Sequence, residues 1–400
     1  MVPPMPDERL PAVVKRLGWV SFFTDAASEM IYPLLPAFLA SIGGGPVALG
    51  FMEGIAEAVS AWVKRKAGTE SDLRGTRKPF VVAGYTLAAL ARPVMSIAWA
   101  PWQIVLLRAL DRTGTGLRSA PRDALVAEAV VEKRRGAAFG FHRMMDNAGA
   151  TLGALLGFTL LEGLHLELRR VFALSIVPAL FAVFLVARLR EEKHSAVPTV
   201  RSNEVLVPLP RAVRRYLAAV LVFTLGGAAD SFLLLHIHGR GLAAGWLPIV
   251  WLSLNLAKAV TNVPGGRLAD RFGRRRTLAI SWALYAGAYA ALALAGSIPA
   301  IWGLIVVYGL YYGLSEGGEK AYLSQLAPKD AQGRAFGTLY AVTGLGVLPA
   351  NLLFGALYAL DARLAFLAAG AFAGMGLLLL MTVPGRSASD VTSSDRKDPS

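Results

Sequence analysis

Acidic side chains occur in pairs inside apolar stretches of this sequence, where ionised groups are costly. Asp25 and Glu29 are four residues apart, and so are Glu53 and Glu57, which places each pair on one face of a helix. An ionised side chain in hydrocarbon costs about 3 kcal/mol on insertion scales, so each carboxylate is a candidate for function. A carboxylate that faces a partly dry cavity could exchange a proton near neutral pH.

Basic and further acidic side chains interrupt the later apolar stretches in the same way. Arg108 and Asp111 lie within one such stretch, and Arg108 cannot release its proton, so it would modulate a nearby carboxylate or hold an anionic substrate. The candidates for proton coupling or for lining a substrate cavity are Asp25, Glu29, Glu53, Glu57, Arg108, Asp111, Arg112, Asp230, Lys258 and Glu316.

Structural roles for the same residues stay open at this stage. Asp25 and Glu29 could lie near the end of a span and contact water, and Glu53 and Glu57 could pair with basic residues across a helix interface. A metal site is not expected, because His236 and His238 point apart on a helix and no cysteine or acidic cluster accompanies them. We also expect no cofactor and no catalytic residue, and the sequence contains no GxxxxGK[ST] loop for ATP.

The composition indicates that lipid surrounds most of the chain. Of the 400 residues, 55% are hydrophobic and 17% are charged, and the mean hydropathy is +0.50. Soluble domains carry about 25% charged residues, so this chain has too few to cover two or three soluble domains. The net charge of +14 comes from clusters between the apolar stretches, such as those at Lys64 and Arg274. This placement is typical of cytoplasmic loops rather than of nucleic-acid binding.

Twelve stretches of the sequence are long enough to cross a bilayer, which takes roughly 20 mostly apolar residues. They lie near residues 17–41, 47–68, 79–98, 102–124, 137–161, 171–189, 215–237, 246–267, 277–295, 299–322, 334–358 and 364–383. The loops after the even-numbered stretches hold most of the clustered Lys and Arg, so both termini are expected to be cytoplasmic, in a plasma (inner) membrane. Residues 1–16 show no cleavable signal, so the first span should act as an uncleaved one.

A repeat divides the chain into two halves. A Gly-x-x-x-Asp-x-x-Gly-x-Arg motif begins at Gly68 and again at Gly266, 198 residues later, and an Ala-Phe-Gly patch begins at Ala138 and again at Ala335, 197 residues later. These offsets predict an all-α membrane protein of two pseudo-symmetric six-helix bundles. The expected divisions are an N-terminal bundle at residues 1–189, a cytoplasmic linker at 190–214, a C-terminal bundle at 215–383 and a disordered tail at 384–400.

The second copy of the motif resembles the loop signature of the major facilitator superfamily. From Gly266 to Arg276 it reads Gly-Arg-Leu-Ala-Asp-Arg-Phe-Gly-Arg-Arg-Arg, after the eighth span, whereas Leu73 and Thr76 replace usual basic residues in the first copy. The resemblance covers essentially the whole chain. It implies a secondary transporter with the twelve-helix fold, which works by alternating access and whose first, fourth, seventh and tenth spans line the cavity.

Two further motifs resemble those of the same family. The run from Arg108 to Asp111 is similar to its intramembrane-arginine motif. Gly149, Gly153 and Gly157 form one helical stripe that resembles the glycine motif of the antiporter branch, with alanine in place of the usual proline at position 154. Such a stripe would allow tight packing against a neighbouring helix.

A cytoplasmic gate is expected at the loop motifs and at the inner ends of the fourth and tenth spans. A motif aspartate could pair with an adjacent arginine in a latch that breaks and re-forms, or the basic loop could be a static topology signal. Arg122-Asp123 corresponds to Glu319-Lys320 with the charges reversed, so the two pairs could close against each other. The gate candidates are Asp72, Arg77, Asp270, Arg271, Arg275, Arg122, Asp123, Glu319 and Lys320.

These observations predict a transporter rather than an enzyme. The preferred hypothesis is proton-coupled efflux, by antiport, of a small organic solute, and proton-coupled uptake of a metabolite by symport is the alternative. A membrane-embedded transferase would need a magnesium-binding acidic pair such as DDxxD, which the sequence lacks. The expected partners are a small-molecule substrate, protons and the lipid bilayer, without nucleic acid, and the chain is expected to be a monomer.

Overall fold

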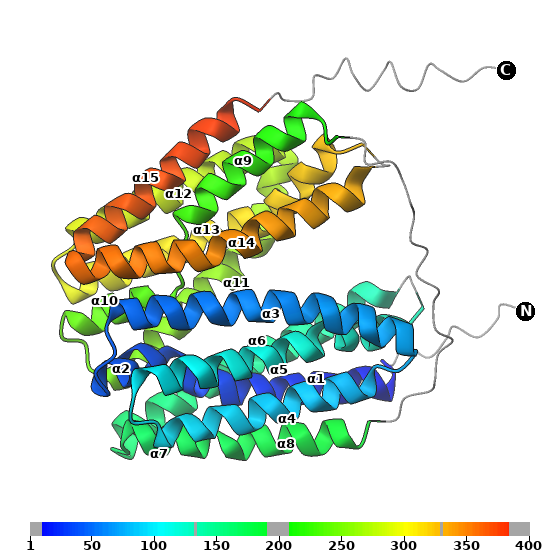
Figure 1. Ribbon diagram of the computed structural model, residues 1–400, viewed down its shortest axis with the longest axis vertical. Helices are drawn as coiled ribbons and strands as arrows, with labels where there is room; N and C mark the ends of the chain where they lie inside the picture. Colours follow the sequence, from blue (N-terminus) through cyan, green and yellow to red (C-terminus); the bar gives the residue numbers. More distant parts are fainter. Residues whose placement is uncertain (1–9, 132–133, 190–207, 329–330, 384–400) are drawn as a thin grey trace, which may run out of the picture. The chain divides into compact units, whose positions relative to one another are not determined.

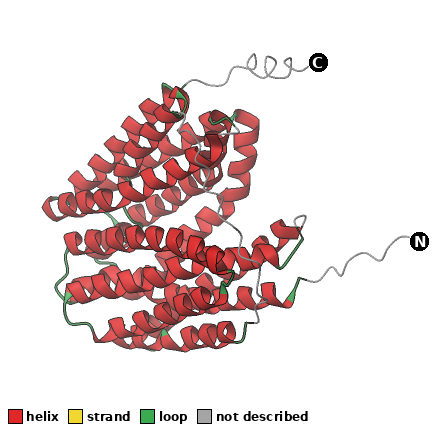
Figure 2. Cartoon of the chain, turned by 45° about the vertical axis from the view of Figure 1, so that its right-hand side comes forward, coloured by secondary structure: helices red, strands yellow, loops and turns green. Residues whose placement is uncertain are grey.

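The computed structural model describes residues 10–131, 134–189, 208–328 and 331–383 (Figure 1). Within these ranges the regular structure is helical, and no strand occurs (Figure 2). Most of the predicted linker and the predicted tail lie outside the described residues. The chain divides into two compact units, Met1–Ser202 with Asp230–Leu252, and Asn203–Ala229 with Ser253–Ser400.

The first unit is built from long helices that pack side by side (Figure 1). Helix α5 packs against α3 and α4, and α8 packs against α1 and α4. The helices are α1 (Ala12–Ile31), α2 (Leu35–Ser41), α3 (Pro46–Arg74), α4 (Lys78–Val94), α5 (Pro101–Glu128), α6 (Arg135–Phe158), α7 (Leu168–Leu174), α8 (Ile176–Ala187) and α10 (Ser231–Gly239). Short turns join several of them: η1 (Tyr32–Leu34), η2 (Met95–Ile97), η4 (Thr159–Gly163) and η5 (Ala244–Trp246).

Proline and glycine set the ends of these helices. α3 and α5 begin with Pro46 and Pro101, whose missing N–H falls in the first turn, where it has no intrahelical partner to lose. α3 is followed by Gly75, which has φ +61°, a left-handed conformation that glycine adopts without the steric cost of a Cβ. Because α4 starts at Lys78, the first loop motif forms a tight turn between two long helices.

The second unit has a core of stacked aromatic rings. Phe223 stacks on Trp282 with ring centroids 4.3 Å apart, and Tyr285 stacks on Tyr289 at 4.3 Å, with Tyr308 at 5.5 Å from Tyr289. The helices are α9 (Arg211–Leu225), α12 (Arg274–Leu294), α13 (Ile298–Leu326), α14 (Gln332–Leu360) and α15 (Ala362–Met381), and the division between the units falls within α11 (Leu247–Phe272).

Seven helices among the described residues are long and apolar enough to cross a membrane. They are Pro46–Arg74, Lys78–Ile97, Leu168–Ala187, Arg274–Leu294, Ile298–Leu326, Gln332–Leu360 and Ala362–Met381. They coincide with the second, third, sixth and ninth to twelfth predicted spans, and the count of twelve stays a prediction. α5 is not among these seven helices, because it carries many charged residues. The first predicted span is interrupted by the short helical turn Tyr32–Leu34.

The glycine stripe of α6 faces the backbone of α1. A Cβ added to Gly149 would collide with the carbonyl of Phe22, and one added to Gly153 would collide with the carbonyl of Ala26. At Gly157 the added Cβ would lie 2.7 Å from the carbonyl oxygen of Met30. These three glycines therefore let two helix backbones approach to a distance that no larger residue permits.

Replacing Gly149 with alanine should reduce the free energy of unfolding by about 1–3 kcal/mol, the usual cost of overpacking. The measurement is unfolding of the purified protein in detergent. Gly140→Ala on the same helix is the matched control, because nothing lies within 4 Å of its added Cβ, and it reports the helix propensity gained by alanine. Equal stability of the two variants would contradict close packing of α1 on α6.

Candidate functional site

Four buried charged side chains form a continuous network inside the first unit. Arg92 Nε on α4 donates to Asp111 Oδ1 on α5 at 2.8 Å, and Arg108 Nη1 donates to Asp111 Oδ2 at 3.0 Å. Arg108 Nη2 also lies 3.7 Å from Glu53 Oε2 on α3. No more than 8% of any of these four side chains is exposed. Two guanidinium groups and two carboxylates thus balance each other, which offsets the desolvation of each ion.

The helices that carry the network approach closely at glycine. A Cβ added to Gly84 of α4 would lie 2.5 Å from the carbonyl oxygen of Gly114 on α5. A Cβ added to Gly114 would lie 2.5 Å from the carbonyl oxygen of Gly84. Arg92 extends the network to α1, because its Nη1 donates to the carbonyl of Thr24 at 2.9 Å. The network therefore ties α1, α3, α4 and α5 together.

Two of the acidic residues face two of the basic residues across the interface between α3 and α5. Glu53 lies beside Arg108, and Glu57 accepts a hydrogen bond from Arg112. Both the acids and the bases are four residues apart, so each pair occupies one helical face and the four side chains form two successive rungs. This arrangement agrees with the structural alternative raised from the sequence, in which Glu53 and Glu57 pair with basic residues across a helix interface.

A second polar cluster lies where α1, α5 and α6 meet. Ser21 Oγ and His142 Nε2 are hydrogen-bonded at 3.0 Å, and His142 Nδ1 lies 3.3 Å from Asp146 Oδ1. Arg122 Nη1 donates to Ser21 at 3.4 Å and its Nη2 donates to Asp123 at 2.8 Å. A serine, an imidazole and carboxylates in one contact chain can pass or hold a proton.

Asp25 lies one helical turn from Ser21 and interacts electrostatically with this cluster. The charges that act on it include those of Asp146, Arg118 and Arg122. Arg118 is 6% exposed, and its guanidinium lies 4.5 Å from the Tyr85 ring centroid. Its Nε and Nη1 atoms have no hydrogen-bond partner in the described part of the chain. The Asp25 carboxylate therefore interacts with charges of both signs.

The remaining candidates of the first unit lie around Tyr32. Glu29 accepts a hydrogen bond from the indole of Trp251, whose ring lies 4.9 Å from that of Tyr32. The Arg108 guanidinium lies 4.8 Å from the Tyr32 ring centroid. Asp230 precedes the first residue of α10, and its charge acts on Tyr32. Eight of the ten proposed cavity residues thus belong to this unit.

The other two cavity candidates belong to the second unit. The ammonium group of Lys258 lies 3.9 Å from the ring centroid of Tyr312, a cation–π arrangement. The side chain of Glu316 lies outside the described residues.

The gate candidates near the first loop motif form a contact set of their own. Arg77 Nη2 donates to Asp72 Oδ1 at 3.1 Å, and the same guanidinium pairs with Glu128 at the end of α5. The motif arginine thus holds the loop between α3 and α4 to a third helix end, while Arg122 and Asp123 pair with each other.

In the second unit, the motif arginines contact helix ends. Arg275 donates to the carbonyl of Met381, the last residue of α15, where the helix dipole favours a cation. The Arg271 guanidinium lies 5.5 Å from the ring centroid of Phe272, and the Lys320 ammonium lies 6.0 Å from the ring centroid of Tyr340. The backbone carbonyl of Glu319 accepts a hydrogen bond from the Tyr216 hydroxyl. The side chain of Asp270 lies outside the described residues. Contact between the reversed pairs stays a prediction, since they belong to different units.

Sequence reasoning missed Arg92 as a candidate. The signal was present, because Arg92 is an ionisable residue inside the predicted span 79–98. His142, Asp146 and Arg118 are likewise charged or titratable residues inside predicted spans, and they are absent from the candidates chosen from the sequence. Their four-residue spacing marks His142 and Asp146 as one helical face.

Long apolar helices with internally paired ions define the class of integral membrane proteins. The chain belongs to the Major Facilitator Superfamily, whose family model matches residues 17–254 and 216–399. Members of this family are membrane transporters of small molecules and are generally not enzymes.

The relatives agree with this assignment. An uncharacterized MFS-type transporter of Methanocaldococcus jannaschii is 30% identical over 383 residues, which cover 94% of this chain and 96% of the relative. The multidrug resistance protein MdtH of Salmonella arizonae is 25% identical over 324 residues, with 77% of this chain and 76% of that protein covered.

Solved structures share the fold at low sequence identity. A mutant of the nucleoside transporter NupG has a TM-score of 0.77 at 11% identity and covers 93% of this chain and 100% of that one. A bacterial homolog of the human lysosomal transporter Spinster has a TM-score of 0.73 at 13% identity, with 97% and 98% covered. These likenesses concern the fold alone.

Proposed function

We propose that this protein is a secondary transporter that exports a small organic solute in exchange for protons by alternating access. The observation that carries the proposal is the buried ionic network of Arg92, Asp111, Arg108 and Glu53. Ionisable groups inside a membrane-spanning bundle are costly, and a fold of this family keeps them where substrate or protons pass. The neighbouring Arg118 guanidinium, with two unsatisfied nitrogen atoms, adds a group that could hold a transient negative charge.

In this proposal Asp25 carries the proton. Its electrostatic interaction with Asp146, Arg118 and Arg122 supports this role, because a proton gained or lost by Asp25 changes the charge that these side chains experience. His142 would orient Asp146 through their contact and through its hydrogen bond to Ser21. Glu53, Arg108 and Asp111 would hold α3, α4 and α5 as one body while that balance changes.

The latch at the first loop motif is proposed as the cytoplasmic gate of this unit. Arg77 joins Asp72 on α3 to Glu128 on α5 across a surface that water reaches. Asp72 is 48% and Glu128 31% exposed while Arg77 is 14% exposed, so water partly screens both ion pairs and the latch can open and close. Arg122 and Asp123 would act with Glu319 and Lys320 in the same gate.

The proposed topology has twelve spans in two six-helix bundles, residues 1–189 and 215–383, in a monomer. Both termini would lie on the cytoplasmic side of an inner membrane. The repeat at offsets 198 and 197 and the clustered basic loops support this arrangement.

Export is favoured over uptake by two observations. One relative is named a multidrug resistance protein, and the α6 glycine stripe packs on α1 as expected for a motif that resembles the antiporter branch. We therefore place the substrate among small organic compounds that the cell expels.

A flux experiment tests the proposal. The purified protein is reconstituted into liposomes and presented with a panel of labelled lipophilic cations, organic anions and nucleosides under an imposed pH gradient. An acidic interior should drive accumulation of at least one compound, and a protonophore should abolish it. Accumulation driven by an alkaline interior would indicate symport instead, and flux that ignores the gradient would exclude proton coupling. Protein-free liposomes provide the background.

A further inference from the structure

The histidine of α6 has both ring nitrogens in polar contacts. His142 Nε2 lies 3.0 Å from Ser21 Oγ of α1, and His142 Nδ1 lies 3.3 Å from Asp146 Oδ1, one turn further along α6. The histidine is 5% exposed and the serine 2%. Because the ring is enclosed, its two nitrogens must be satisfied by these neighbours rather than by bulk water.

These contacts assign the hydrogen of the neutral imidazole to one ring nitrogen. An ionised carboxylate can only accept, so the nitrogen that faces Asp146 carries the hydrogen. Arg122 Nη1 donates to Ser21 Oγ at 3.4 Å, which leaves the hydrogen of the serine for the other nitrogen, Nε2. The chain from Arg122 through Ser21 and His142 to Asp146 thus has one direction, with each hydrogen pointing toward the next group.

Asp25 lies level with Asp146 because α1 and α6 run in the same direction. The glycine stripe of α6 meets successive carbonyls of α1 at steps of four residues on each helix. Ser21 contacts His142, and one turn further along their helices lie Asp25 and Asp146. The charge of Asp146 acts on Asp25. Because like charges oppose each other's ionisation, one of the two carboxylates binds a proton before the other.

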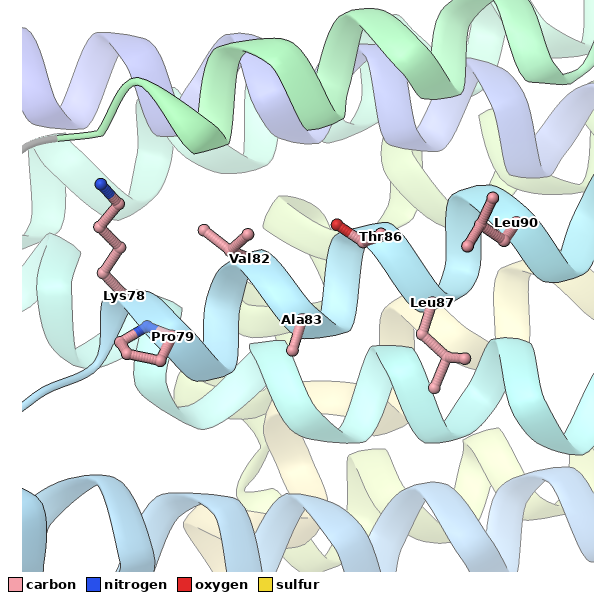
Figure 3. Close-up of a pocket in the computed structure, with 7 residues that line it drawn as sticks. All are labelled: Lys78, Pro79, Val82, Ala83, Thr86, Leu87 and Leu90. Atoms are coloured by element: carbon pink, nitrogen blue, oxygen red, sulfur yellow. The ribbon is translucent and has the colours of Figure 1, made fainter.

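Access from outside does not decide between the two carboxylates. Asp25 and Asp146 are both partly exposed. Figure 3 shows a pocket on α4 that is lined by residues between Lys78 and Leu90. The lining found in the described part of the chain includes neither carboxylate. The order in which the two bind a proton therefore depends on the groups beside them.

The groups beside the two carboxylates differ. Asp25 is subject to charges of both signs, which partly cancel. Asp146 faces the N–H of His142, and a hydrogen directed at a carboxylate favours its ionised form. The charged groups that act on Asp25 are Asp146, Arg118, Glu29 and Arg122, and the groups that act on Asp146 include His142, Arg122 and Ser21.

We propose that His142 selects the carboxylate that carries the coupling proton: its Nδ1–H holds Asp146 in the ionised form, so that Asp25 takes up the proton. The O–H bond that forms on Asp25 receives its proton from water and returns it to water, and the imidazole keeps its single hydrogen throughout. His142 is a positioning residue, because it acts through Asp146. This inference rests on the proposed function, in which Asp25 is the proton carrier, and gives the reason for that choice.

The test reads the protonation of the two carboxylates separately. Full-length protein in detergent is labelled with carbon-13 at the side-chain carboxyl of aspartate, and Asp25→Asn and Asp146→Asn assign the two resonances. As the pH is lowered from neutral, the Asp25 resonance should move first, while the Asp146 resonance stays at the position of an ionised carboxylate. Protonation of Asp146 before Asp25 in the unmodified protein would overturn the proposal.

Two substitutions of His142 separate its N–H from its ability to titrate. His142→Leu fills the site without a donor, so the ratio of protonated Asp146 to protonated Asp25 should rise about tenfold, a typical effect of losing one polar contact to a charged group. His142→Asn keeps an N–H on the atom bonded to Cγ, where Nδ1 stands, and cannot titrate, so it should leave the ratio unchanged. An unchanged ratio in His142→Leu, or an equal rise in both variants, would overturn the proposal.

Ser21→Ala tests the direction of the chain. Without the serine hydroxyl the ring can also carry its hydrogen on Nε2, so the ratio should rise, by less than in His142→Leu. Ser175→Ala is the matched control, because Ser175 is a fully buried serine whose hydroxyl donates to the carbonyl of Phe172. No change in Ser21→Ala, or an equal change in Ser175→Ala, would overturn the assigned position of the hydrogen. Melting in detergent shows that each variant is folded.

The carboxyl resonances do not depend on transport. If Asp25 binds its proton first but flux ignores the pH gradient, the selection by His142 stands and the proposed proton coupling fails. If flux follows the gradient but Asp146 binds its proton first, the coupling stands and the selection by His142 fails.

Discussion

Asp111→Asn should destabilise the protein by about 3–5 kcal/mol, the range found when one partner of a buried ion pair is removed. Asp111 accepts hydrogen bonds from Arg92 and Arg108 through its two carboxylate oxygens. The amide has nearly the same shape but no charge, and its NH₂ group would face a guanidinium. Two buried cations would then be balanced by Glu53 alone. Denaturant unfolding of the purified protein in detergent measures the loss.

Two further variants make this result specific to the buried network. Glu70→Gln removes an acid from an exposed pair with Arg74, so it should change stability by less than about 0.5 kcal/mol. The double variant Arg92→Met, Asp111→Leu removes one charge of each sign and should recover most of the stability lost by Asp111→Asn. If Asp111→Asn unfolds at the same denaturant concentration as the unmodified protein, the four side chains are not a buried network.

Asp25→Asn should abolish accumulation driven by a pH gradient while leaving exchange of substrate across the liposome membrane. The amide cannot take up or release a proton, but it keeps the size of the carboxyl group and its place beside Arg118 and Arg122. Substrate identified in the flux panel is measured in two modes, accumulation against an imposed gradient and counterflow without one. Proton coupling by Asp25 predicts loss of the first mode and retention of the second.

The same two measurements distinguish coupling from damage to the fold. Glu70→Gln again serves as the control, because it removes a carboxylate from an exposed pair with Arg74 that belongs neither to the ionic network nor to the Asp25 cluster, and it should preserve both modes. Loss of both modes in Asp25→Asn would assign Asp25 to substrate binding or folding. Undiminished accumulation in Asp25→Asn would place the coupling group elsewhere, with Asp146 as the next residue to replace.

The fold was largely predictable because the length of an apolar stretch is written directly in the sequence. The third predicted span, 79–98, and the helical segment Lys78–Ile97 differ by one residue at each end. The breaks inside predicted spans were harder to predict from the sequence. The first predicted span is broken by the turn at Tyr32–Leu34, and α9 ends at Leu225, well before α10 begins. Proline at position 33 and two glycines at 226 and 227 accompany these breaks, and hydropathy averages over them.

The site was predictable within each helix but not between helices. A four-residue spacing assigns Glu53 and Glu57 to one face, and the structure places Arg108 and Arg112 opposite them. The pairing of Arg92 with Asp111 depends on how α4 is rotated and shifted against α5. That register is set by the contact between two glycine backbones, which no charge pattern reports.

The aromatic core of the second unit has a consequence for how this chain evolved. At the repeat offset of 197, Tyr308 corresponds to Asp111 and Ile305 to Arg108, so rings and aliphatic groups occupy the positions that ions hold in the first unit. After an ancestral gene duplication, the two copies would have diverged in the forces that hold them together. They are no longer interchangeable, and a fusion of two first units would double the number of buried ions without gaining the hydrophobic stacking that Tyr308 provides.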